Sequence, residues 1–220
     1  AADMADVQWW KSFKDPVLDS LIETAIRENL DLQNASAKVD QYLGVLDTTR
    51  SQFFPQITAS FTPAVQRSYQ TLNNTTESYQ AALNASWEID LWGRIRRSSE
   101  AARARILGSE AGRRAVLLSV VSNLASAYIT LRGLDLELEI VRDTEKAYAE
   151  SLKLFQLRFK YGTISQLELS QAESNYESAR QAIPSYESLV RQQENTICLL
   201  LGRVPGPIPR GKSLRELMPP

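Results

Sequence analysis

The chain has 220 residues, of which 43% are hydrophobic and 23% charged, so it can bury a core and is not a disordered segment. Lys and Arg number 25 against 26 Asp and Glu, and a net charge of −1 gives no electrostatic basis for binding nucleic acid. Histidine is absent, which excludes imidazole metal sites and Ser-His or Cys-His catalysis. We therefore expect no enzyme activity, no metal and no cofactor.

The remaining compositional features are weak signals. The one cysteine, Cys198, lies in an apolar run and is expected to be a buried, inert thiol. No stretch reaches the ~18 apolar residues of a membrane helix, so no spanning helix is predicted. No signal peptide opens the chain, and the start at Ala1 is expected to be a mature or trimmed end.

Two helices are predicted in the first quarter of the chain. Asp15 suits an N-cap and Pro16 the first helical position, ahead of apolar residues at helical spacing. Asn29 interrupts this pattern. A second helix is predicted from about Leu30 to Phe53, before a proline that ends it.

Between residues 57 and 91 the apolar period changes from 3.6 to 2, which indicates strands. Two strands of about ten residues, joined by a polar loop at 70–78, are predicted to form a β-hairpin. One face is apolar and carries Ile57, Ala59, Phe61, Pro63, Val65, Tyr79, Ala81, Leu83, Ala85, Trp87, Ile89 and Leu91. The other face is mainly polar, and its second strand carries Gln80, Ala82, Asn84, Ser86, Glu88 and Asp90.

Strands with one apolar and one polar face occur in half-buried soluble sheets and in membrane barrels. Three features favour a barrel. Glu88 and Asp90 have no basic partner in register, aromatics stand near the ends of the apolar face (Tyr79, Trp87, Trp92), and a two-stranded hairpin is not stable alone. Periodicity by itself leaves both structures open.

A long helix is predicted from Arg94 to about Tyr161, a length of roughly 100 Å at 1.5 Å per residue. Its apolar residues follow a heptad, and only Glu145 breaks the pattern. One row of this seam is Leu117, Leu124, Leu131, Leu138, Glu145, Leu152 and Phe159, and the other is Val120, Ala127, Leu134, Val141, Tyr148 and Phe155.

The long helix is predicted to turn back on itself at residues 161–165. Gly162 suits a left-handed position after the helix, and Ser165 with Glu168 makes a capping box for the next helix. That helix repeats the heptad from Leu169 to Leu200 and ends at Gly202, before a proline-rich tail. The seam 117–159 is therefore expected to pack against 169–200 in an antiparallel helical hairpin.

Two further patterns each allow two interpretations. Glu88 and Asp90 lie about 7 Å apart on one strand face, a spacing within the range of an inverting glycosidase pair, but solvated or pore-lining carboxylates are favoured. The basic run at the start of the long helix could suggest nucleic acid, but solvated or headgroup-level arginines are favoured. Its members are Arg94, Arg96, Arg97, Arg103, Arg105, Arg113 and Arg114.

Four segments resemble those of a known family, the TolC-type outer-membrane efflux channels, and in particular the lipoprotein branch that works with resistance-nodulation-division pumps. They are Trp10-Lys11-Ser12-Phe13 with Asp15-Pro16, then Ser51 to Ile57, then Ser86 to Arg96, and finally Tyr161 to Ser165 with Leu167, Glu168, Leu169 and Ala172. The most specific is Ser86-Trp87-Glu88-Ile89-Asp90-Leu91-Trp92-Gly93-Arg94. Together the segments cover nearly the whole chain in the family's order.

The resemblance implies a homotrimer with one pore, a twelve-stranded barrel in the outer membrane and a long α-barrel in the periplasm. Family protomers carry two structural repeats, so one repeat is expected here, and truncation is favoured over a barrel of six copies. The lipidated cysteine of the branch would lie upstream. The implied partners are a periplasmic adaptor (membrane fusion) protein, an inner-membrane resistance-nodulation-division pump and outer-membrane lipid, with no nucleic acid. The implied adaptor contacts are Arg158, Gly162, Thr163, Ser165 and Leu167.

Four segments are expected: an N-terminal segment with a short helix (1–29), a periplasmic helical domain (30–55 and 93–202), a β-barrel hairpin (56–92) and a proline-rich tail (203–220). The expected lipid-facing residues are Ile57, Phe61, Leu83, Trp87 and Ile89, and the expected pore-lining residues are Asn84, Ser86, Glu88 and Asp90. The predicted function is a passive export duct for small molecules (drugs, metals or other toxic compounds) in a tripartite efflux system. The alternative is a coiled-coil scaffold of the cell envelope without a pore.

Overall fold

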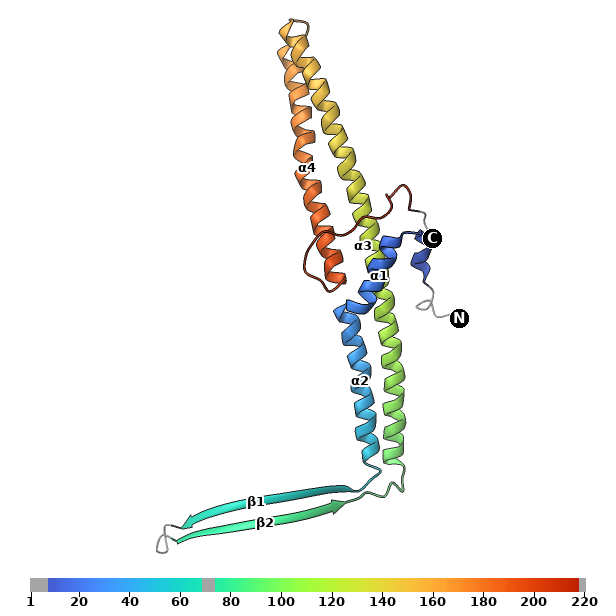
Figure 1. The fold of residues 1–220 in the computed structure, drawn as a ribbon, viewed down its shortest axis with the longest axis vertical. Coiled ribbons are helices and arrows are strands. Elements are labelled where there is room, and N and C mark those ends of the chain that lie inside the picture. Colours follow the sequence, from blue (N-terminus) through green and yellow to red (C-terminus); the bar gives the residue numbers. More distant parts are fainter. Residues whose placement is uncertain (1–7, 69–73, 218–220) are drawn as a thin grey trace. The chain divides into compact units, whose positions relative to one another are not determined.

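The computed structural model describes residues 8–68 and 74–217, which form a mainly helical chain with one antiparallel β-hairpin (Figure 1). In chain order the elements are a 3-10 helix η1 (Trp9–Phe13), α1 (Pro16–Glu28), α2 (Leu30–Ser51), β1 (Gln56–Ser68), β2 (Asn74–Ser86), α3 (Arg94–Lys160) and α4 (Gln166–Leu200). The chain forms two compact units: residues up to Asn34 together with those from Arg113 onward, and residues Ala35–Gly112. The predicted fold class, a long antiparallel helical hairpin with two strands, is confirmed.

The first helix begins at its predicted N-cap, and Asn29, predicted only to interrupt the helical pattern, lies between α1 and α2. Asp15 Oδ1 accepts a hydrogen bond from the Val17 amide at 2.9 Å, and Pro16 occupies the first helical position of α1. Asn29 ends α1, and its Oδ1 accepts from the amide of Leu32 at 3.0 Å in the first turn of α2. The preceding η1, which buries Trp10 and Phe13, was not predicted.

The core of the first unit joins α1, α3, α4 and the C-terminal tail. α1 buries the face that carries Leu18, Leu21, Ile22 and Ala25, and these side chains belong to one cluster with residues of α3 and α4. The largest fully buried members are Leu18, Ile22, Leu124, Tyr128, Leu131, Ile197 and Leu201.

The predicted pairing of α3 with α4 is correct for part of the seam. The two helices run antiparallel: Arg142 Nη2 contacts Glu187 Oε1 at 2.7 Å, and Gln193 Nε2 donates to the Ala127 carbonyl at 2.9 Å. At the start of the seam, Val120 belongs to the apolar cluster that also contains residues of α1 and of α4, and Leu117 packs against this cluster.

One helix within the described residues, α3, is long and apolar enough to cross a membrane by length and composition. The expectation that no stretch would pass this test is therefore wrong. The signal comes from the uncharged run 115–131. That run carries Val121, Leu124, Tyr128 and Leu131, which are buried in the core of the first unit, so we interpret it as a core segment.

The β-hairpin has the predicted alternation of faces. Ile57 pairs with Ala85 and Ala59 with Leu83, and residues directly opposite in an antiparallel pair share a face. The register therefore brings the apolar faces of the two strands together. The rings of Phe61 and Tyr79 stack on this face with centroids 6.4 Å apart.

The predicted strand ends are wrong at both ends of the second strand. β2 begins at Asn74, inside the predicted loop, and stops at Ser86, whereas the prediction continued to Leu91. Trp87, Glu88, Ile89 and Asp90 therefore follow the strand and do not alternate on its faces. The rest of the predicted loop, residues 70–73, lies outside the described residues.

Candidate functional site

The connection from β2 to α3 is held by an ion pair between Glu88 and Arg94. Arg94 donates from Nε to Oε1 at 2.9 Å and from Nη2 to Oε2 at 2.6 Å. These hydrogen bonds hold the pKa of Glu88 below its usual value. The sequence analysis considered only partners in register across the strand, and this partner comes instead from six residues along the chain.

Asp90 closes the first turn of α3 through backbone contacts. Its Oδ2 accepts from the Arg96 amide at 2.9 Å. Desolvation alone would raise the pKa of Asp90, but hydrogen bonds from the backbone amides of Arg96, Ile95 and Arg94 outweigh it and lower the pKa. A glycosidase needs one carboxyl with a raised pKa as its general acid. Both carboxyls have lowered values, which argues against the glycosidase interpretation.

The connection from α2 to β1 and the connection from β2 to α3 meet at Trp87. Its Nε1 donates to the Phe53 carbonyl at 3.1 Å, and Gln56 Nε2 donates to the Ser51 carbonyl at 3.0 Å. The residues around this contact line an open hollow of about 450 Å³, namely Gln52, Phe54, Gln56, Ser86, Trp87, Glu88 and Arg94.

The apolar face of the β-hairpin is uncovered. Ile57, Phe61 and Leu83, three of the predicted lipid-facing residues, are 69%, 66% and 75% exposed. Asn84 and Ser86, from the predicted pore-lining set, lie on the opposite face by register. A soluble sheet would cover such an apolar face with a second layer. No element covers it among the residues that the structure describes.

The turn between α3 and α4 has the predicted caps. Gly162 has φ +71°, its amide donates to the Phe159 carbonyl at 2.9 Å, and the Thr163 amide donates to the Arg158 carbonyl at 3.0 Å. This pair of hydrogen bonds is a Schellman motif. The capping box of Ser165 is also present, with the Glu168 amide donating to Ser165 Oγ.

The adaptor contacts implied by the family are brought together at this turn. The Thr163 hydroxyl donates to the Arg158 carbonyl at 2.9 Å, and Leu167 is 78% exposed. Hydrogen bonds from the Ser165 amide and hydroxyl to Glu168 Oε2 lower the pKa of that carboxyl. No atom lies within 4 Å of the position that a Cβ would take on Gly162, so the turn is open at this glycine.

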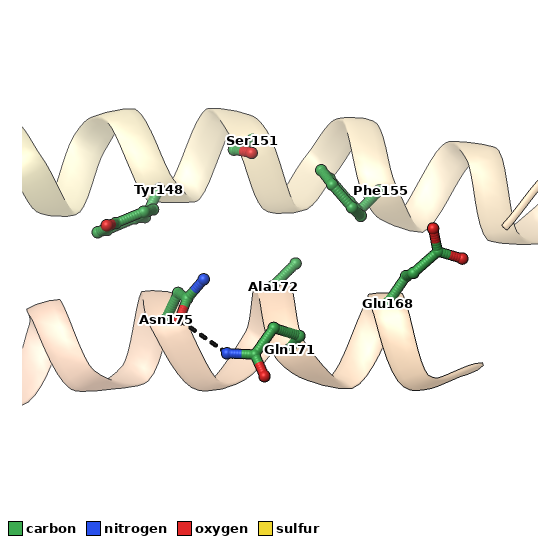
Figure 2. Close-up of a pocket in the computed structure, with 7 residues that line it drawn as sticks. All are labelled: Tyr148, Ser151, Phe155, Glu168, Gln171, Ala172 and Asn175. Atoms are coloured by element: carbon green, nitrogen blue, oxygen red, sulfur yellow. Dashed lines mark hydrogen bonds between the residues drawn. The ribbon is translucent and has the colours of Figure 1, made fainter. Parts of the chain in front are cut away.

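A groove between the two helices continues from the turn. Figure 2 shows that Tyr148, Ser151 and Phe155 of α3 line it on one side. Glu168, Gln171, Ala172 and Asn175 of α4 line the other, and its volume is about 200 Å³. Gln171 Nε2 donates to Asn175 Oδ1 at 3.1 Å, so part of its polar wall is already paired within α4.

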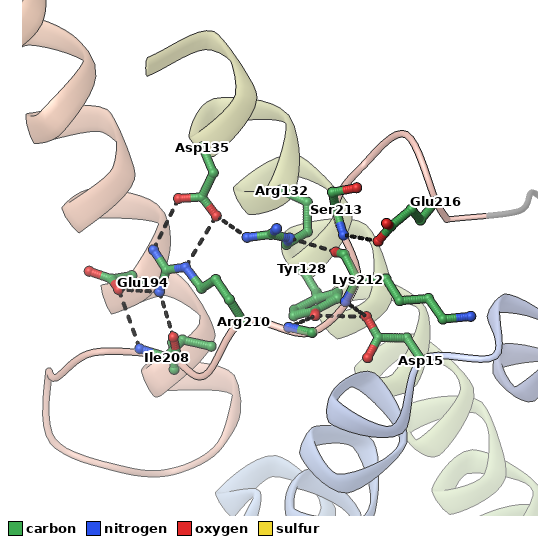
Figure 3. Close-up of polar contacts among 11 residues, drawn as sticks. Asp15, Tyr128, Arg132, Asp135, Glu194, Ile208, Arg210, Lys212, Ser213 and Glu216 are labelled. Carbon is green, nitrogen blue, oxygen red and sulfur yellow. Dashed lines mark hydrogen bonds and ion pairs between the residues drawn. The ribbon is translucent and has the colours of Figure 1, made fainter. Parts of the chain in front are cut away.

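At the other end of α4, a polar cluster ties the C-terminal tail to the helices, and the sequence did not predict it (Figure 3). Asp15 is fully buried, and its Oδ2 accepts from Tyr128 Oη at 2.9 Å and from the Lys212 amide at 3.1 Å. The Tyr128 hydroxyl also accepts from the Gly211 amide at 3.0 Å. Burial, and then the hydrogen bond to Asp15, raise the pKa of Tyr128 to about 12.

The same cluster continues through Arg210. This guanidinium contacts Asp135 of α3 at 3.1 Å and Glu194 of α4 at 2.5 Å. Arg132 Nε donates to the Lys212 carbonyl at 2.9 Å. We call Asp15, Tyr128, Arg132, Asp135, Glu194 and Arg210 the tail clamp. It fixes residues 210–212 against α1, α3 and α4.

The chain thus combines a β-hairpin that has an uncovered apolar face with a long antiparallel helical pair. Residues 21–203 match the family described as Outer membrane efflux protein, and the chain belongs to this family.

Two related proteins support the same assignment. The chain is 34% identical over 210 residues to the toluene efflux pump outer membrane protein TtgC of Pseudomonas putida, covering 92% of this chain and 43% of that protein. It is 32% identical over 197 residues to SilC of Salmonella typhimurium, whose name describes an outer membrane lipoprotein, covering 90% of this chain and 43% of SilC.

The fold matches solved structures of such channels. A crystal structure of CusC, solved to describe folding and transmembrane channel formation, superposes with a TM-score of 0.80 at 28% identity, over 97% of this chain and 50% of that chain. The chain thus spans about half the length of the relatives that it matches. Membership in an efflux family agrees with the expectation that the chain is not an enzyme.

Proposed function

We propose that the chain forms part of an outer-membrane channel, a passive exit duct for small molecules, with its β-hairpin in the membrane and its long helices in the periplasm. The observation that carries this proposal is the β-hairpin register, which gathers large apolar residues on one uncovered face in a member of the efflux family. A passive duct needs no catalytic group, only a pore wall and a partner that drives transport.

In this proposal Ile57, Phe61 and Leu83 face lipid, and Asn84 and Ser86 face the lumen. Trp87 and Ile89 follow the strand at the membrane boundary. Glu88 and Asp90 are left out of the pore wall, because an ion pair and a helix turn already use their charges. The helical segments 30–55 and 93–202 form the periplasmic part.

The proposed assembly is a homotrimer that works with a periplasmic adaptor and an inner-membrane resistance-nodulation-division pump. The turn at residues 158–167 is the proposed adaptor contact, because its small residues and open glycine let another helix approach closely. The names of related efflux proteins refer to toluene, antibiotics and solvent, so small organic compounds are the proposed cargo. Selection among them is expected to lie in the pump.

The decisive experiment is single-channel conductance of the complete protein in a planar bilayer. Steady conductance is expected from the assembled protein, whereas the 220-residue chain alone should conduct nothing, because its strands leave edges that lipid cannot satisfy. A complete protein that assembles but never conducts would indicate the coiled-coil scaffold instead.

A pair of adjacent substitutions tests the assignment of the two faces. Leu83→Arg places a charge in lipid and should cost about 2–4 kcal/mol of folding free energy in bilayers. Asn84→Arg should mainly change conductance and ion selectivity, because it points to the lumen. Equal folding losses for the two variants would contradict the assignment.

A further inference from the structure

We propose that the start of α3 and the connection that precedes it bind the phosphate headgroups of an anionic phospholipid surface. This inference rests on the proposed function, which places the β-hairpin in the outer membrane. It goes further by assigning a headgroup-binding surface to particular residues at the periplasmic boundary.

The basic residues supply the charge. Five arginines lie between residues 94 and 105: Arg94, Arg96, Arg97, Arg103 and Arg105. Arg94 is paired with Glu88, and Arg97 with Glu100 at 2.6 Å. Within the described parts of the chain, the exposed Arg96, Arg103 and Arg105 form no ion pair. The positive charge of Arg103 and Arg105 is available to an external anion, and that of Arg96 is shared with the nearby Asp90 carboxylate.

The helix presents these arginines on both sides of a buried line. Ile95, Ser99 and Ala102 are buried and mark the packed face of α3 in the second unit. Arg96 and Arg103 are seven residues apart, two helical turns, and therefore share one flank of this face. Arg94 and Arg105 are eleven residues apart, about three turns, and share the other flank.

Exposed aromatic and apolar side chains accompany the charge. Trp92 is 96% exposed, Leu91 78% and Phe54 69%, all within the connections between strands and helices. Tryptophan is enriched at membrane boundaries, where its ring meets both acyl chain and headgroup. A free phosphate ion would use the arginines but would have no use for these side chains.

The guanidinium groups are the available anion-binding groups at this end of α3. The Arg96 amide, which a phosphate could otherwise use at a helix start, already donates to Asp90. Arg96 lies within the first turn, and Arg103 and Arg105 lie about 10–14 Å further along the helix. At about 0.15 M salt the screening length is about 8 Å, so the first turn should contribute most.

The test is binding of the 220-residue chain to vesicles. One set is phosphatidylcholine alone, and the other contains one-third phosphatidylglycerol. The test variant combines Arg96→Gln, Arg103→Gln and Arg105→Gln. The matched control removes the same charge elsewhere, through Arg180→Gln, Arg191→Gln and Arg215→Gln, three exposed arginines far along the chain from the proposed surface.

Each basic residue near an anionic membrane is worth up to about a fivefold change in partitioning. The test variant should therefore lose at least tenfold of its affinity for phosphatidylglycerol vesicles, and the control variant much less. Binding to phosphatidylcholine should be the same for all three proteins, and the preference should collapse in high salt.

The outcomes separate this inference from the proposed function. Equal binding of all proteins to both vesicle types would overturn the arginine surface and leave the membrane hairpin intact. No binding to either vesicle would overturn the arginine surface, whereas the proposed channel is tested separately by the conductance of the complete protein. Preference for a soluble oligonucleotide over phosphatidylglycerol vesicles, lost in the test variant, would overturn the lipid assignment in favour of nucleic acid.

Discussion

The turns at Gly162 and Gly202 have the same backbone conformation, but the space around Gly162 is open and the space around Gly202 is filled. Gly162 has φ +71° and Gly202 φ +69°, and each ends its helix with the same pair of hydrogen bonds. A Cβ on Gly202 would lie 2.6 Å from the Glu28 carbonyl, whereas a Cβ on Gly162 would meet nothing within 4 Å. The same Schellman turn therefore occurs in a packed junction at Gly202 and at an exposed helix end at Gly162.

The packing around the two turns differs in the same way. At the Gly202 turn, Asn29 Nδ2 donates to the Leu200 carbonyl at 2.8 Å, and Arg203 contacts Glu28 at 3.0 Å. Near the Gly162 turn, Leu157 and Tyr161 are 50% and 72% exposed. A chain that leaves one end of a helical pair unpacked keeps that end available to a partner.

The largest effect is expected in the packed core beyond the Gly202 turn. Leu131→Ala should lower the free energy of unfolding by about 2–5 kcal/mol, because Leu131 is fully buried. Leu138→Ala should cost less, since Leu138 is half-buried and lies at the edge of the cluster. Urea unfolding followed by circular dichroism measures both. A larger loss at Leu138 would contradict this placement of the core.

The next effect compares the two glycines directly. Gly202→Ala should cost about 2–4 kcal/mol, from a left-handed backbone (roughly 1–2) and from overpacking against the Glu28 carbonyl. Gly162→Ala should cost only the backbone part, about 1–2 kcal/mol. The same urea titration on both variants gives the difference. Equal losses would show that Gly202 is not needed for close approach.

Whether the sequence predicts a contact depends on how far apart its two residues lie in the chain. Asp15, Gly162, Ser165 and Glu168 act within a few residues, so their caps were predicted from spacing alone. The tail clamp was missed because it joins Asp15, Tyr128 and Lys212, which are more than 80 residues apart. The only local signal was a tyrosine in the uncharged run 115–131.

The strand end was missed for a different reason. Alternation continues through Glu88 and Asp90, so periodicity extends the strand, but both carboxylates bind the start of α3 instead. Periodicity shows which residues are apolar, but it does not show which carboxylates will bind the start of a nearby helix.

The tail clamp predicts an alkaline loss of stability. The pKa of Tyr128 is raised from 10.0 to about 12, so the neutral phenol stabilises the fold fully below pH 10, and this contribution is lost as the pH rises through 12. Its size is about 2–3 kcal/mol. Tyr128→Phe should be less stable at neutral pH and should lose less stability between these pH values than the unsubstituted chain. Parallel pH profiles for the two proteins would contradict a raised pKa.

The smallest effect on stability, and the sharpest test of the open end, is expected from a size series at Gly162. Asparagine tolerates the left-handed conformation better than alanine, so Gly162→Asn should be the more stable of the two variants. Their difference should be below about 1 kcal/mol, measured by urea unfolding. From alanine to asparagine, side-chain size and stability therefore both increase, so the two roles of Gly162 predict opposite orders of export for these variants.

Export by the complete protein, in cells that hold its adaptor and pump, then separates the two roles of Gly162. If the turn is a docking surface that needs close approach, export should fall with side-chain size, from glycine through alanine and asparagine to Gly162→Trp, while the trimer still assembles. If Gly162 only caps α3, export should follow the strain of the turn, and asparagine should retain more export than alanine. Crosslinking to the adaptor provides a second measurement, because contacts made by small residues are weak singly and depend on repetition around the assembled ring.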